Sequence, residues 1–151
     1  MHHYLRYTLA VVLIPVSLFC ARVPQARAGA LKPEIWMSGG FVDASYHDSP
    51  LACARAGAGI EAFKHLTFGV CVQADRDRYF NFGYVGVVLP ALGLFEPYGR
   101  FQAGRRDDLD DTALGWTAGL RVGNGTVNFL MEVHGVTQPG SSNGASVGVS
   151  F

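Results

Sequence analysis

The sequence lacks a hydrophobic run long enough for a membrane-spanning helix. The longest apolar stretch, Thr8–Phe19, is about 12 residues, whereas a spanning helix needs roughly 20. The sequence also lacks an excess of positive charge, since 12 Lys and Arg balance 12 Asp and Glu. No basic surface for nucleic acid is therefore expected. Pro- or Ser-rich linkers are absent too, which favours a single domain.

Cysteine is scarce. Only Cys53 and Cys71 lie in the part of the chain that contains the expected strands, and an even pair in an exported protein is consistent with a disulfide. In the expected strand register, however, they lie about four residues apart along neighbouring strands, roughly 13 Å at 3.4 Å per residue. That separation exceeds the limit of about 7 Å between the Cα atoms of a disulfide. We therefore predict two free thiols.

The N-terminus has the layout of a secretory signal peptide. Arg6 precedes the apolar run, and small residues follow at Ala26 and Ala28, as at a cleavable export signal. We expect residues 1–28 to be removed and residues 29–151 to form the mature domain. Arg6, Arg22 and Arg27 would leave with the signal, so the mature domain would be weakly acidic.

What the sequence does contain is a series of segments in which apolar residues alternate with polar or small ones. In the last segment, Ala145, Val147, Val149 and Phe151 alternate with Ser and Gly. Alternation of period two is typical of β-strands with one apolar face. The eight expected strands cover approximately residues 34–46, 53–62, 66–75, 79–88, 95–103, 114–122, 127–134 and 144–151.

The charged side chains of these segments share the polar face. A small barrel can pair such charges inside while its apolar face contacts lipid. This distribution therefore favours a membrane barrel. The expected interior set is Arg55, Glu61, Glu96, Arg100, Arg121, Glu132 and His134, and the glycines expected to leave room for it are Gly57, Gly59, Gly69, Gly83, Gly115 and Gly119.

Two local patterns refine this interpretation. Asn124-Gly125 is a strong signal for a two-residue type I′ hairpin turn, which would pair Gly123 with Thr126 and Leu120 with Phe129. The stretch from Arg105 to Asp111 is the most charged part of the chain, and we expect it to be an external loop. The faces of the first strand stay open, because Trp36 and Val42 oppose Ile35, Met37 and Phe41.

The alternating strands, the export signal and the terminal Phe151 together resemble the small eight-stranded outer-membrane barrels of the OmpA/OmpX or opacity type. The resemblance implies an all-β, antiparallel, up-and-down transmembrane barrel with a polar interior filled by side chains. It implies a monomer in the bacterial outer membrane that contacts lipid and lipopolysaccharide. Phe151 would belong to the insertion signal for the barrel assembly machinery. A structural or surface-interaction role through short external loops follows, with no open pore and no cofactor.

Three alternatives remain. A soluble, lipocalin-like barrel would turn the apolar face inward, but no Gly-x-Trp motif is present near the first strand. A lipid A deacylase could use Glu132 and His134 with Ser141 or Ser142, yet that family has x-Ser-Asn after its His, and here Gly135-Val136-Thr137 follows. A metal site in Asp107–Asp111 lacks the spacing of a calcium loop. We therefore expect neither an enzyme nor a metal site.

Overall fold

The computed structural model describes residues 31–44, 48–63, 65–76, 78–107, 109–123, 126–138 and 141–151, without the side chains of residues 44, 109–111 and 138. The expected signal peptide and the Asn124-Gly125 turn lie outside these residues. No helix of the described part is long and apolar enough to cross a membrane. The described chain forms eight strands: β1 (Leu31–Ala44), β2 (Leu51–Ala62), β3 (Leu66–Asp75), β4 (Tyr79–Val88), β5 (Phe95–Arg106), β6 (Leu109–Gly123), β7 (Asn128–Gln138) and β8 (Ser142–Ser150).

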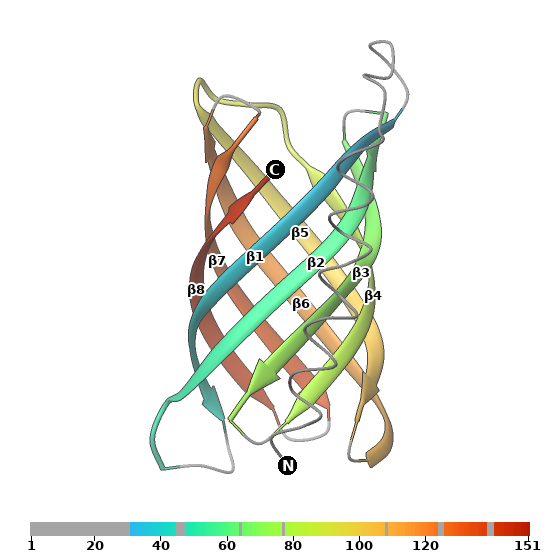
Figure 1. Ribbon diagram of the computed structural model, residues 1–151, viewed down its shortest axis with the longest axis vertical. Coiled ribbons are helices and arrows are strands. Elements are labelled where there is room, and N and C mark those ends of the chain that lie inside the picture. The colour runs from blue at the N-terminus through green and yellow to red at the C-terminus, as the bar shows by residue number, and fades with distance from the viewer. Residues whose placement is uncertain are drawn as a thin grey trace. The chain divides into compact units, whose positions relative to one another are not determined.

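The strands pair in chain order and close into one antiparallel barrel (Figure 1). The last strand, β8, pairs with β1, for example Val147 with Gly39. Closure satisfies the backbone groups of every strand and leaves no open sheet edge, which is the condition for a sheet to lie in lipid. The predicted eight-stranded up-and-down barrel is confirmed.

Alternate residues point to the outside of the barrel and to the lumen. On β7, Phe129, Met131 and Val133 are 68%, 58% and 50% exposed, whereas Leu130 and Glu132 are buried. Trp116 on β6 is also exposed on the outside, while Arg100 and Glu132 are buried inside. The soluble, lipocalin-like alternative required the opposite arrangement, so it is wrong.

Strand β4 departs from this rule. Its aromatic side chains Phe80, Phe82 and Tyr84 are buried inside the barrel, whereas Val85 and Val87 face outward. Gly83 is on the outer face, so the prediction that it lies inside with the other glycines is wrong. Both faces of β4 are largely apolar, and alternation alone could not decide between them. On β1 the open question is settled, because Trp36 and Val42 are buried inside.

The β6–β7 hairpin has a different register from the predicted one. Gly123 pairs with Asn128 and Leu120 with Met131, so the connection spans residues 124–127 and the two-residue turn is wrong. The error is a shift of two residues. Because side chains alternate with period two, an even shift leaves every residue on its predicted face, and matching the faces could not detect it.

The connections between strands are short. At the end of the barrel that carries Phe151, called here the Phe151 end, they cover residues 63–65, 89–94 and 124–127. At the opposite end, called the loop end, they cover residues 45–50, 76–78, 107–108 and 139–141. The charged stretch predicted as a loop lies mostly in β5 and β6, with a register shift at Arg105/Arg106. Long, strongly polar strand ends can extend beyond the lipid, so charge did not mark a loop here.

Cys53 and Cys71, the cysteines of the described residues, are free thiols, as predicted, and both are buried. Cys53 pairs with Asp75 across the β2–β3 ladder, whereas Cys71 pairs with Gly57. The four-residue offset is the one expected from the sequence, and it keeps the two sulfur atoms from forming a bridge.

Candidate functional site

The lumen contains a network of ion pairs centred on Glu132 of β7. Its carboxylate accepts hydrogen bonds from five side chains on four other strands, β1, β2, β5 and β8. The Oε1 atom accepts from Tyr98 Oη at 2.7 Å and Arg100 Nη1 at 3.3 Å. The Oε2 atom accepts from Ser38 Oγ, Arg55 Nη1 and Ser146 Oγ at 2.9, 3.1 and 3.2 Å. Both oxygens of this buried carboxylate are therefore satisfied, as a buried charge requires.

Glu34 of β1 forms the second centre of the network. Its Oε1 atom accepts from Arg100 Nη2 and Arg121 Nη2, both at 2.7 Å. Arg100 thus joins Glu34 to Glu132. Glu34 was not predicted as an interior residue, because alternation did not resolve the faces of the first strand. Glu34, Trp36 and Ser38 are spaced two residues apart, so they share one face of the strand, and all three point into the lumen. This spacing was the signal that could have identified Glu34.

Arg121 of β6 extends the network toward the Phe151 end. Its Nη1 atom lies 3.3 Å from Glu61 Oε2 and 3.1 Å from Glu96 Oε2. The side chain of Glu96 is 37% exposed, so the network reaches solvent there. All six charged residues predicted for the interior are thus in one network, together with Glu34.

Several of these contacts cross the whole barrel. Glu34 on β1 binds Arg100 on β5, and Arg121 on β6 binds Glu61 on β2. Arg55 on β2 donates to Thr117 Oγ1 on β6 at 2.7 Å. In a closed eight-stranded barrel, strands four apart in order lie on opposite walls. These three ties therefore connect opposite walls through the lumen.

Aromatic rings line one side of the network. The guanidinium carbon of Arg100 lies 4.5 Å from the ring centre of Trp36, 5.2 Å from that of Tyr84 and 4.6 Å from that of Tyr98. Such contacts stabilise a desolvated cation by about 2 kcal/mol or more. The inward glycines were predicted to make room for charged side chains, but four of them, Gly57, Gly59, Gly69 and Gly119, lie against aromatic side chains. A Cβ at Gly57 would lie 2.5 Å from Trp36 Cε2, and one at Gly119 would lie 2.6 Å from Tyr98 Cζ.

His134 is buried in the lumen beside Cys53. Its Nε2 atom is 3.9 Å from Cys53 Sγ, and its Nδ1 atom has no partner among the described residues. Ser142 Oγ is also buried without a described partner, so no Ser–His hydrogen bond is formed there. The described residues therefore do not assemble the Ser–His–acid group of the deacylase alternative.

No group of three or more His, Cys, Asp or Glu side chains in the described part of the chain is arranged to hold a metal ion. The side chains of residues 108–111, within the acidic stretch, lie outside the described part.

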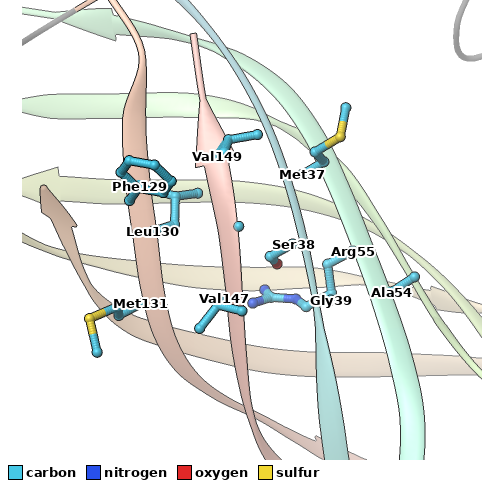
Figure 2. Close-up of a pocket in the computed structure, with 11 residues that line it drawn as sticks. Met37, Ser38, Gly39, Ala54, Arg55, Phe129, Leu130, Met131, Val147 and Val149 are labelled. Carbon is cyan, nitrogen blue, oxygen red and sulfur yellow. The ribbon is translucent and has the colours of Figure 1, made fainter. Parts of the chain in front are cut away.

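An apolar groove lies on the outer surface across β7, β8, β1 and β2 (Figure 2). Phe129 and Met131 lie on one side of it and Met37 on the other, with Val147 between them. The groove is part of the exposed apolar belt, which is the surface that lipid contacts in a membrane barrel.

No protein-family model matches this sequence, and no curated protein matches it. Solved structures do match. A de novo designed transmembrane β-barrel has a TM-score of 0.66 at 12% identity, covering 83% of this chain and 97% of the other. Neisserial surface protein A (NspA) has a TM-score of 0.53 at 15% identity, covering 80% and 96%. The N-terminal β-barrel domain of Pseudomonas aeruginosa OprF has a TM-score of 0.53 at 12% identity, covering 78% and 97%. The chain thus shares the fold of the small eight-stranded outer-membrane barrels.

Proposed function

We propose that the protein is a bacterial outer-membrane barrel with a structural role in the membrane and no open pore. The observation that carries the proposal is the inverted distribution of side chains. Phe129 and Met131 are exposed on the outside, while Arg55, Arg100 and Glu132 are buried inside. An apolar exterior of this kind is costly in water and favourable in lipid.

The absence of a pore is supported by the contacts that cross the lumen. Arg100 and Arg121 both bind Glu34, and Arg55 binds Glu132. The interior of an eight-stranded barrel is just wide enough to be filled by side chains. A continuous water path would require several of these buried ion pairs to separate together.

A structural role is favoured over recognition through large loops because little chain lies outside the strands. At the loop end, residues 76–78 and 107–108 each form a whole connection. The surface that could bind another protein is therefore small. The partners that fit such a barrel are membrane lipids and the sugar and phosphate groups of lipopolysaccharide.

Cell fractionation combined with heat-modifiable gel mobility tests the proposed location. We expect the protein in the outer-membrane fraction after removal of residues 1–28, which N-terminal sequencing would establish. The folded barrel should migrate faster in unheated than in boiled samples. Recovery in the soluble periplasmic fraction would overturn the proposal.

We also propose that Phe151 belongs to the signal read by the barrel assembly machinery. Its backbone exchanges two hydrogen bonds with Ile35, at 2.8 and 3.2 Å, and its side chain is exposed on the outside. Phe151→Ala should lower the folded fraction in cells but not refolding from urea into detergent. Phe95→Ala is the matched control, because Phe95 is also exposed at the Phe151 end. Equal effects of the two substitutions in cells would contradict the assignment.

A further inference from the structure

Cys53 and His134 form a pair of metal-binding side chains inside the barrel. They come from β2 and β7, and the Cys53 Sγ and His134 Nε2 atoms are 3.9 Å apart. Cys53 is 6% exposed and His134 is 1% exposed. Cys53 is a free thiol, and neither residue belongs to the ion-pair network. The pair therefore has no role in the function proposed above.

The barrel wall is shaped to hold the imidazole ring in this position. Gly144 of β8 pairs with His134. A Cβ at Gly144 would lie 3.0 Å from His134 Cε1 and 2.7 Å from Val42 Cγ1. The backbone oxygen of Phe41 would be closer still, so a larger residue at Gly144 would clash with the barrel wall and would also crowd the ring.

The hydrogen bonds of His134 are incomplete. Its Nδ1 atom is buried and has no partner among the described residues, so neither neutral tautomer satisfies both ring nitrogens there. A thiol is in addition a weak partner for the other nitrogen. The Nε2 lone pair is therefore available to a ligand that can accept it.

The distance between the two donor atoms fits a metal ion. Typical bonds from zinc are about 2.3 Å to sulfur and about 2.0–2.1 Å to nitrogen. An ion of that size would bind both donors across the observed 3.9 Å with an S–metal–N angle of about 130°. A linear arrangement would need only a few tenths of an ångström more, about 4.3 Å between the donors.

The number and type of donors select the ion. Thiolate sulfur favours soft ions such as Cu(I), and the described residues offer no group of three ligands. Two donors suit the low coordination numbers of Cu(I) and Ag(I) better than the four ligands of zinc.

Charge leads to the same choice. A thiolate with a monovalent ion is neutral, whereas a divalent ion would leave a net positive charge in the lumen. The buried charges beside Cys53 are Arg55 on the same strand and Asp75 opposite it on β3, and they are already paired with Glu132 and Arg78. An additional unpaired buried charge would be costly.

We propose that Cys53 and His134 bind one soft monovalent ion of the Cu(I) and Ag(I) class. The thiol proton is released to solvent, a sulfur–metal bond forms, and the His134 Nε2 lone pair completes the coordination. No electron is transferred, because the ion enters and stays in the monovalent state.

Isothermal titration calorimetry tests this site. The refolded barrel is titrated with Ag(I) in chloride-free detergent buffer. We expect one tight Ag(I) per chain. Cys53→Ser and His134→Gln should each weaken binding by at least about tenfold, since even residues that only orient a ligand contribute 10–100-fold. Cys71→Ser is the matched control, because Cys71 is also a buried, free thiol, and it should leave the tight site intact.

Heat-modifiable mobility of each variant would establish that the barrel is folded before titration. Equal loss of binding in Cys53→Ser and Cys71→Ser would overturn the proposal, as it would reduce the effect to general thiol chemistry. Unchanged affinity in a folded His134→Gln variant would also overturn it. Neither result would affect the proposed location or the absence of a pore.

Discussion

The clearest energetic prediction concerns Glu132, the centre of the lumen network. Glu132→Gln keeps the shape of the side chain but removes its charge. Arg100 would still bind Glu34, whereas Arg55 would lose its ion pair and keep its hydrogen bond to Thr117 and its contact with the Trp36 ring. The amide nitrogen of Gln would also face donors, since all five groups around Glu132 donate to it.

The expected cost follows from burial. Removing one partner of a buried ion pair destabilises a protein by about 3–5 kcal/mol, because the remaining charge stays buried without compensation. We therefore expect Glu132→Gln to lower the free energy of unfolding by about that amount. Urea unfolding in lipid vesicles, monitored by tryptophan fluorescence, would measure it as a shift in the transition midpoint at constant slope.

Glu96→Gln is the matched control for this experiment. Glu96 also binds an arginine of the network, but its side chain is 37% exposed, and Arg121 keeps Glu34 and Glu61 without it. A partly exposed pair contributes at most about 1 kcal/mol. A control variant as unstable as Glu132→Gln would refute the reasoning that burial sets the worth of these pairs.

Three further predictions concern the wall and the lumen. Gly119→Ala should cost about 1–3 kcal/mol by crowding Tyr98, whereas Gly83→Ala should be tolerated because its nearest contact would be at 3.8 Å; urea midpoints of the two variants would compare them. Val133→Arg on the outer face should destabilise the barrel by about 2–4 kcal/mol if the site is near the bilayer midplane, and Val133→Leu should be nearly neutral in the same unfolding assay. Wild type should be silent in planar bilayers, and Arg100→Ala should raise conductance by breaking the tie between β1 and β5; a wild type that conducts as well as the variant would contradict the plugged lumen.

Much of the barrel could be predicted because alternation reports which face of a strand is apolar. Strand β3 was predicted with its observed bounds, Leu66–Asp75. The charged residues of the lumen were assigned to one face because burying a charge in lipid is unfavourable, which leaves only the interior for Arg100 and Glu132.

The failures have equally specific causes. Strand β4 carries Phe80, Phe82 and Tyr84 on one face and valines on the other, so hydrophobicity could not distinguish lumen from lipid. The lumen takes the aromatic rings because Arg100 packs against Tyr84. This contact joins β4 to its neighbour β5, so it depends on cross-strand pairing, which alternation within one strand does not report.

The register of paired strands and the lengths of their connections also could not be predicted from alternation. The β6–β7 hairpin differs from prediction by two residues, a shift that alternation does not detect. The pairing of Cys53 with His134 could not be predicted either, because it depends on which strands meet across the lumen. Neither residue has a motif around it that indicates a shared site.

The central claim is that apolar side chains face lipid while the lumen is ionic, and the two tryptophans of the chain provide its most direct test. Trp116 is 38% exposed on the outer face and Trp36 is 1% exposed in the lumen. Trp36→Phe and Trp116→Phe each leave one fluorophore, whose quenching by brominated lipid can be measured in vesicles. The account predicts strong quenching of Trp116 and little quenching of Trp36. Equal quenching of both, or stronger quenching of Trp36, would contradict it.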